Sequence, residues 1–239
     1  MMNLLQIKSL VTKRYRKTTF IVVILMYVAG TIGLLLPFTQ PYFKLASPSN
    51  LWISLILLLL FHKDFNKSFI ITIIIIFLTG FFVEVVGVHT GVIFGKYWYG
   101  RTLGVKLFEV PVVIGANWLL LIYCSSVVTF NIFEIFTKYF KNSFSLNHPF
   151  IKTLFATSLM VFLDYLIEPV AVSLDFWHWE FEKIPTQNFQ AWFLIAFILN
   201  YLFLNSKFLK SNSLAGLLLF LQFFFFISIH IFNLLSSKK

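Results

Sequence analysis

Three acidic residues lie within apolar stretches, where a charge is costly. Glu84 is in the stretch 69–88, and Asp164 and Glu168 are near the end of the stretch 150–168. An ionisable side chain inside a membrane-spanning helix costs at least ~2.5 kcal/mol on insertion scales, so it usually faces other helices and marks a functional site. Asp164 and Glu168 are four positions apart and share one helical face. Two carboxyls that close in apolar surroundings do not both ionise easily, so we expect one of them to keep its proton and act as an acid.

Each acidic region is followed by a cluster of aromatic residues. Residues 97–99 read Tyr-Trp-Tyr, and residues 177–179 read Trp-His-Trp. Tryptophan and tyrosine gather at the membrane interface, which by itself explains both clusters. Aromatic faces also stabilise cations, so beside an acid they can shelter a carbocation that the acid creates by protonating an alkene. The candidate walls of such a pocket are Tyr97, Tyr99, Trp177 and Trp179, with Trp118 and Trp192 from the segments that follow.

The two regions match as an internal repeat. An offset of 80 relates Glu84 to Asp164 and carries the first aromatic triplet onto the second. An offset of 74 then relates Pro111 to Pro185 and Trp118 to Trp192. The chain is therefore predicted to form one membrane-embedded helical domain, residues 1–239, that contains a hairpin repeat at 80–130 and 160–206.

Other polar residues near these regions have simpler roles. His89 and His178 are candidates to relay a proton or to orient water. We expect Asn117 to form a hydrogen bond across helices and Asn188 to cap a helix. Glu109 is predicted to lie at the surface. The histidines and acids are too scattered for a metal site, so no metal is expected. Close helix packing or a hinge is predicted at Gly87, Gly91 and Gly95.

The composition places these residues in a membrane protein. The chain has 239 residues, of which 59% are hydrophobic and 12% charged, and its mean hydropathy is +0.87. A helix that crosses the ~30 Å hydrocarbon layer needs about 20 apolar residues. Seven runs qualify, which predicts an all-α, polytopic membrane protein with about seven transmembrane helices. The predicted spans are 18–36, 44–61, 69–88, 111–130, 150–168, 189–206 and 214–235. The second is strongly apolar only over 51–61, so six helices is the alternative count. The first is predicted to be a retained anchor and not a signal peptide.

The basic residues predict an orientation in the cell membrane. With a cytoplasmic N-terminus, twelve of the 19 lysines and arginines face the cytoplasm, which agrees with the positive-inside rule and needs no nucleic-acid partner. The cytoplasmic set is Lys8, Lys13, Arg14, Arg16, Lys17, Lys63, Lys67, Lys138, Lys141, Lys152, Lys207 and Lys210. The opposite set is Lys44, Lys96, Arg101, Lys106, Lys183, Lys238 and Lys239. Both aromatic clusters then lie on the outer face, with Glu84 and Asp164 roughly 6 to 8 Å below the ends of their helices.

Several functional classes lack the residues that they require. A retinal protein needs a lysine in its last helix, and the run 214–235 contains none. Membrane prenyltransferases use two aspartate-rich motifs, whereas Asp164 and Glu168 stand as a single pair. No Walker motif, nucleophile elbow or histidine-rich oxygenase box is present. The single cysteine, Cys124, forms no internal disulfide and is expected to pack in a helix.

Two stretches resemble the integral-membrane carotenoid biosynthesis family, which includes bisanhydrobacterioruberin hydratase and the carotenoid 1,2-hydratases. They read EVVGVHTGVIFGKYWYGRTLGVKLFEVPVVIGANW at 84–118 and DYLIEPVAVSLDFWHWEFEKIPTQNFQAW at 164–192. The most specific parts are T-G-x-x-F-G-x-Y-x-Y at 90–99, and E-P-V-A followed by W-x-W at 168–179. The resemblance covers residues 80–205. The chain departs from the family pattern at residues 108–109, and at Asp175 and Ala191, where glycine is usual.

The resemblance implies a reaction that agrees with the residues. Members of this family add water across the terminal 1,2 double bond of a carotenoid with an open, ψ-type end, and no cofactor is implied. The expected partners are a carotenoid of the lycopene or γ-carotene type, water and membrane lipid. Asp164 or Glu84 is then the expected proton donor, and Glu168 its partner or the base that activates water. The alternatives are a membrane carotenoid cyclase and a non-catalytic carrier of lipid or carotenoid.

Overall fold

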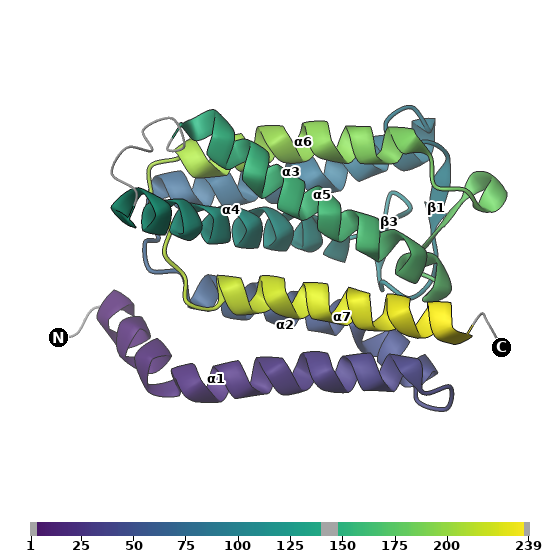
Figure 1. Ribbon diagram of the computed structural model, residues 1–239, viewed down its shortest axis with the longest axis horizontal. Coiled ribbons are helices and arrows are strands. Elements are labelled where there is room, and N and C mark those ends of the chain that lie inside the picture. Colours follow the sequence, from purple (N-terminus) through teal and green to yellow (C-terminus); the bar gives the residue numbers. More distant parts are fainter. Residues whose placement is uncertain (1–3, 140–147, 237–239) are drawn as a thin grey trace.

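A computed structural model describes residues 4–139 and 148–236, with side chains described from residue 14 onward. Its long elements are seven helices (Figure 1). They are α1 (Leu4–Leu35), α2 (Gln40–Leu60), α3 (Lys67–Thr90), α4 (Val113–Tyr139), α5 (Pro149–Ser173), α6 (Thr186–Asn205) and α7 (Ala215–Ser236). In the described part of the chain all seven contain a segment long and apolar enough to cross a membrane. The predicted seven spans are confirmed, including the doubtful second one. The predicted orientation also uses Lys8, Lys13, Lys141, Lys238 and Lys239, which lie outside the residues whose side chains are described.

The helices form two groups around α4 (Figure 1). Helices α3, α5 and α6 pack together with α4, while α1, α2 and α7 lie on its other side. Helix α4 contacts α2, α3, α5, α6 and α7. Every one of its residues from 113 to 126 is buried except Asn117. Its almost continuous apolar sequence fits this central position, because a helix that is apolar all round is surrounded by other helices.

Helix α5 continues past Pro169. A residue before proline tends to leave the α region, so an end of the helix at Glu168, at the interface, was the alternative to burial of this residue. In the structure α5 extends to Ser173, with Pro169 inside the helix. Proline removes one backbone hydrogen bond without ending a helix that packing supports. As a consequence Glu168 lies inside the bundle and is buried.

Glycines end α3 and shape the turn that follows. Gly91 takes the left-handed conformation, with φ of 66°, and its N–H donates to the carbonyl of Gly87 at 2.8 Å. A Cβ at Gly87 would lie 2.6 Å from the ring of Phe94, and one at Gly95 would lie 2.6 Å from Pro185. The structural role predicted for these glycines is confirmed: Gly91 caps the helix, and the others permit close packing.

The two aromatic triplets form a small sheet that the sequence did not predict. Strand β1 (Tyr97–Tyr99) pairs antiparallel with β4 (Trp177–Trp179), and Trp98 lies opposite His178. Strands β2 (Lys106–Leu107) and β3 (Val110–Pro111) form a second pair within the first loop. Both loops therefore lie at the same end of the bundle, as predicted, and are joined by backbone hydrogen bonds.

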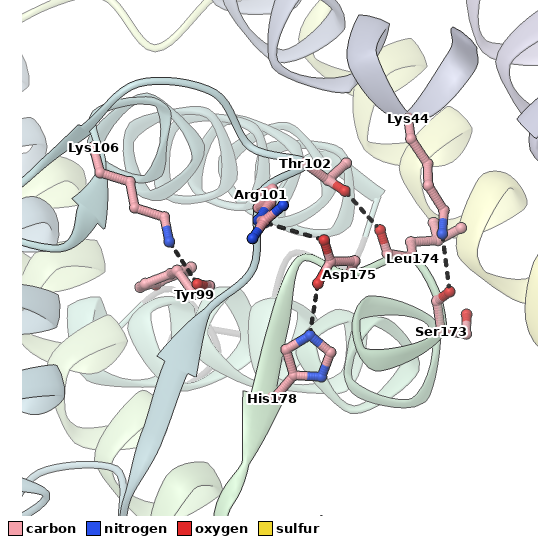
Figure 2. A network of polar contacts seen from close by, with 9 residues as sticks. All are labelled: Lys44, Tyr99, Arg101, Thr102, Lys106, Ser173, Leu174, Asp175 and His178. Atoms are coloured by element: carbon pink, nitrogen blue, oxygen red, sulfur yellow. Dashed lines mark hydrogen bonds and ion pairs between the residues drawn. The ribbon is translucent and has the colours of Figure 1, made fainter. Parts of the chain in front are cut away.

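Side chains strengthen this connection (Figure 2). Asp175 accepts a hydrogen bond from the backbone N–H of Arg101 at 3.1 Å and pairs with Nε2 of His178 at 2.7 Å. The hydroxyl of Thr102 donates to the carbonyl of Leu174 at 2.9 Å. A Cβ at Gly100 would lie only 2.1 Å from the backbone oxygen of Asp175, so only glycine permits this approach. The paired loops cover the ends of α3 and α5, where the acids are.

Candidate functional site: two buried carboxyls under the aromatic loops

The three acids predicted to do chemistry are all buried near the loop end of the bundle. The exposed fractions of Glu84, Glu168 and Asp164 are 4%, 1% and 0%. Glu84 lies six residues before the end of α3 and Glu168 five residues before the end of α5. At 1.5 Å per residue these positions are about 9 and 8 Å below the helix ends, and Asp164 is one turn deeper.

Glu84 accepts hydrogen bonds from three aromatic side chains. The hydroxyls of Tyr97 and Tyr99 donate to its Oε2 at 2.5 and 2.8 Å, and Nε1 of Trp118 donates to its Oε1 at 3.0 Å. Burial, together with the nearby Glu84 carboxylate, raises the pKa of both tyrosines above the usual value, so they remain protonated donors. Three donors around one carboxylate suit its ionised form, which can only accept.

Glu168 is held in the same way by a different set of donors. Nε1 of Trp177 and Nε1 of Trp179 donate to its Oε2 at 3.1 and 2.8 Å. Nδ2 of Asn188 donates to its Oε1 at 2.8 Å. These donors are all N–H groups, which cannot accept a proton from the carboxyl. Oε1 accepts a single bond from them, so it retains a lone pair on which a proton can sit.

Asp164 has no such support. It is fully buried, and among the described residues neither of its carboxyl oxygens has a hydrogen-bond partner. An isolated ionised carboxyl in an apolar setting is strongly unfavourable, and such a group takes up a proton instead. Asp164 is one turn from Glu168 on the same helix, so the pair has the arrangement in which two carboxyls share one proton.

The hydrogen bonds correct one pairing in the predicted repeat. The offset of 80 makes Asp164 the counterpart of Glu84, but the structural counterpart of Glu84 is Glu168, one helical turn later. Glu84 and Glu168 each receive two bonds from the strand residues that follow them, and Tyr97 lies opposite Trp179 in the sheet. The offset of 80 aligns the aromatic triplets, but Trp177 follows Glu168 by nine residues whereas Tyr97 follows Glu84 by 13. The rings of Trp118 and Trp192, which the offset of 74 relates, stack at 4.2 Å between centroids, and the repeat itself stays a prediction.

A small cavity separates the two carboxyls. Its volume is about 20 Å³, and its wall includes both Glu84 and Glu168. This volume is enough for about one water molecule, which needs at least 10–15 Å³ by this kind of measure. The remaining wall is formed by Phe94, Tyr97, Tyr99, Ile114, Asn117, Trp118, Trp177, Trp179, Asn188 and Trp192. Seven of the nine predicted site side chains beyond the acids are therefore brought together here.

A larger apolar cavity lies next to the small one. Its volume is about 230 Å³, and it is formed by residues of α1, α2, α4, α5, α7 and both loops. Ile114, Asn117 and Trp177 contribute to the walls of both cavities. Ile167, the neighbour of Glu168, also lines the larger cavity. An apolar chain in the larger cavity would thus have its end directed toward the carboxyls past Asn117 and Trp177.

Some predicted residues have other positions. His89 is exposed and bonds to the carbonyl of Val85 in its own helix. His178 stacks on Trp98 and pairs with Asp175 on the solvent side of the sheet. The structure therefore does not bring either histidine into the small cavity. Glu109 is exposed, as predicted.

Sequence reasoning missed the role of Asn188. The sequence favoured helix capping, but the residue before α6, Pro185, holds the N-cap position, and Asn188 donates its side chain to Glu168. With an exposed fraction of 1%, it is shielded from bulk solvent. The offset of 74 relates Asn188 to Ile114, an apolar position, and this polar exception within the repeat was the available signal.

Seven membrane-length helices with a buried carboxyl pair beneath aromatic hairpins define a polytopic membrane protein whose site faces an apolar cavity. The family model described as "Carotenoid biosynthesis protein" matches residues 49–237. The chain therefore belongs to the carotenoid biosynthesis protein family, and the match extends beyond the 80–205 covered by the motifs. Helix α1, which forms part of the apolar cavity, lies before the matched residues. Neither the curated proteins nor the solved structures with which the chain was compared include a match.

Proposed function

We propose that the protein is a carotenoid hydratase that adds water to the terminal 1,2 double bond of an open, ψ-type carotenoid end. The observation that carries this proposal is the water-sized cavity between Glu84 and Glu168, next to a larger apolar cavity. A polyene dissolved in the bilayer enters the apolar cavity between helices and directs its end past Trp177. Membership of a carotenoid biosynthesis family supports a carotenoid as the substrate.

The Asp164–Glu168 pair supplies the proton. Two buried carboxyls one turn apart hold one proton between them, and Glu168 is the member of the pair that lines the small cavity. Glu168 protonates C2 of the terminal double bond, and the positive charge develops on the tertiary carbon C1. The sequence left Asp164 and Glu84 as alternative donors. The unpartnered oxygens of Asp164 favour its role as the proton reserve behind Glu168.

Glu84 is the base that activates water. As C1 becomes cationic, a water molecule in the small cavity adds its oxygen to C1 and transfers a proton to Glu84. The alkene has then gained one proton and one hydroxyl, Glu84 has gained a proton, and the Asp164–Glu168 pair has lost one. Transfer of that proton from Glu84 to Glu168 through another water restores the site. Net consumption is one water, and no cofactor is required.

The aromatic walls stabilise the cation and position the carboxyls. Trp177 lines both cavities, so its face is available to a cationic carbon at the end of a chain in the larger one. Trp179, Tyr97 and Tyr99 line the small cavity and support the charge from the side of the water. The same side chains donate hydrogen bonds to the carboxyls, which fixes the acid and the base before the substrate arrives.

The volume of the site favours hydration over cyclisation. A cyclase forms the same first cation but must fold the chain back on itself before the ring closes. The cavity of about 20 Å³ beside the carboxyls has space for one water and no space for a second segment of polyene. With a cytoplasmic N-terminus, the site lies near the outer face, within reach of water from that side.

Product mass tests the proposal. The protein is expressed in a bacterial host that accumulates lycopene or γ-carotene, and the pigments are analysed by mass spectrometry. Hydration adds the mass of one water per reacted end, whereas cyclisation adds nothing. Glu109→Gln, an exposed acid in the first loop, is the matched control and should retain the product. Membrane-inserted protein that forms no hydrated pigment from either substrate would contradict the proposal.

A further inference from the structure

A polar patch lies in the wall of the larger cavity, remote from the carboxyls. Tyr27 from α1, Asn50 from α2 and Gln222 from α7 contribute to it. The hydroxyl of Tyr27 pairs with Oγ of Ser54 at 3.3 Å, and Ser54 donates to Oδ1 of Asn50 at 3.3 Å. Most of the surrounding wall is apolar, so these side chains form a separate polar region inside a hydrocarbon-lined space.

The side chain of Gln222 interacts with the hydroxyl of Tyr27 through its amide group but leaves its oxygen without a partner. It is 3% exposed, and within the described ranges its Oε1 has no hydrogen-bond partner. A buried amide oxygen without a partner is unfavourable, and most buried polar atoms in proteins avoid this state. Because Gln222 lines the cavity, a bound molecule can satisfy it. An amide oxygen only accepts, so that molecule must supply a donor.

We propose that Gln222 is the centre of a subsite for a hydroxyl group carried on an isoprenoid chain. A hydroxyl donates to Oε1 of Gln222 and at the same time accepts from Nδ2 of Asn50, because the hydroxyl of Tyr27 already donates to Ser54. Space is available there, because a Cβ at Gly30 would have only Phe225 at 3.8 Å and Asn50 Nδ2 at 3.9 Å as neighbours. A pure hydrocarbon fills the apolar part of the cavity but leaves Gln222 unpaired.

The position of the subsite sets the length of the chain. Gln222 lies 14 residues before the end of α7, and Glu168 lies five residues before the end of α5. Nδ2 of Asn233 donates to Oγ of Ser173 at 3.3 Å, so α7 and α5 are level there. At 1.5 Å per residue, Gln222 is about 9 Å deeper than Glu168. The axes of packed helices are about 8–10 Å apart, so the two positions are separated by roughly 13 Å overall. Helix α7 ends at the same end of the bundle as β1 (Figure 1). An extended chain covers ~1.2 Å per bond, so the hydroxyl and the reacting double bond are about 11 bonds apart. This spacing rests on the proposed function, which places the double bond at the carboxyls.

Farnesol is a suitable probe, because its hydroxyl and its terminal isopropylidene group are separated by about this length. Binding of farnesol, and of the same hydrocarbon without the hydroxyl, is measured on the purified protein in lipid nanodiscs. The readout is the change in tryptophan fluorescence, since Trp177 lines the cavity. One net hydrogen bond is expected to make farnesol bind roughly fivefold more tightly than the hydrocarbon.

Variants separate the subsite from general effects of buried polar groups. Gln222→Met keeps the side-chain length and should remove the preference for farnesol while retaining hydrocarbon binding. Asn50→Leu, which removes the donor to the bound hydroxyl, should reduce the preference. Thr129→Val is the matched control: Oγ1 of Thr129 is also buried and without a partner among the described residues, but it lies outside both cavities. This variant should keep the full preference.

The outcomes distinguish this inference from the proposed hydration. Equal binding of farnesol and the hydrocarbon by the unmodified protein, or an unchanged preference in a folded Gln222→Met protein, would overturn the subsite. If Gln222→Met does not fold, an unchanged preference in Asn50→Leu overturns it instead. The binding assay involves no reaction. A protein that prefers farnesol but forms no hydrated pigment would therefore refute the hydratase and leave the subsite in place.

Discussion

The two halves of the site hold a carboxyl in the same way but with donors of different chemistry. Glu84 is bonded by two tyrosine hydroxyls and an indole, whereas Glu168 is bonded by two indoles and an amide. A hydroxyl can both donate and accept, so the tyrosines can pass a proton on. An indole N–H and an amide NH₂ only donate, so they fix Glu168 without offering its proton an exit. In the proposed mechanism this difference suits Glu84 to take up a proton from water and pass it on, and suits Glu168 to hold a proton until the substrate takes it.

The halves also differ one turn deeper in the membrane. Asp164 precedes Glu168 by four residues, and the residue four before Glu84 is Gly80. A Cβ at Gly80 would lie 2.4 Å from Cβ of Trp118, so the first half has no room for a second acid. The second half accommodates Asp164 without a partner, which gives this half its capacity for a shared proton.

The largest expected effect comes from neutralising either carboxyl. Glu84→Gln and Glu168→Gln should each lower the rate of hydration by about 10²–10⁴-fold, because each removes one member of an acid–base pair. The double variant should be little slower than either single one, since the two groups act as a unit. Pigment mass analysis at matched protein levels measures the amount of hydrated product that each variant forms. Near-normal turnover in either single variant would remove that residue from the mechanism.

The donors themselves give the next largest effect. Tyr99→Phe and Trp177→Phe each remove one hydrogen bond to a buried carboxylate, which is worth about 1.5–3 kcal/mol. Both should slow hydration about 10- to 100-fold. Only Trp177→Phe should also change the concentration of carotenoid needed for half-maximal rate, because Trp177 lines the larger cavity and Tyr99 does not contribute to that wall. If both variants changed this concentration, or if neither did, the two donor sets would not have different roles.

Gly80 and Asp164 provide a comparison of stability. Gly80→Ala should destabilise the fold by about 1–3 kcal/mol, because the added methyl group overlaps Trp118. Asp164→Ala should leave stability unchanged or raise it, because it removes a buried carboxyl that has no partner in the described structure, while hydration falls. Thermal unfolding in lipid nanodiscs measures both. A large loss of stability in Asp164→Ala would show that Asp164 has a structural role.

The sequence predicted the helices and the grouping of the acids because both follow from the cost of polar groups in hydrocarbon. Seven apolar runs and the burial of Glu84, Asp164 and Glu168 are consequences of that cost. The pairing of Glu84 with Glu168 was not predictable in the same way. It depends on loop length and on the pairing of β1 with β4, and strands of three residues have almost no periodic signal. The role of Asn188 depends in turn on α5 continuing past Pro169.

The smallest expected effect concerns the loops that cover the two halves. The offset of 80 relates Gly95 in the first loop to Asp175 in the second, and both adopt positive φ, 100° and 60°. In the first loop glycine meets this requirement and packs on Pro185. In the second loop, Asp175 adopts this less favourable conformation. Its carboxyl bonds to Arg101 of the first loop and to His178 of its own loop. Asp175, which stands where glycine is usual in the family pattern, therefore connects the two loops.

This connection should depend on pH with a definite sign. Partial burial acts to raise the pKa of Asp175, but hydrogen bonds from His178 and the N–H of Arg101, with the charge of Lys44, lower it below its usual value overall. A lowered pKa gives stability that is present above the unfolded value of ~3.9 and is lost as pH falls through the folded value. The side chain is 42% exposed, so solvent limits the effect to less than about 1 kcal/mol. Acid titration of tryptophan fluorescence should therefore show the loops loosening below about pH 4 in the unmodified protein. Asp175→Asn should lack that transition, and an identical transition in both proteins would mean that the loops are held together by β1 and β4 alone.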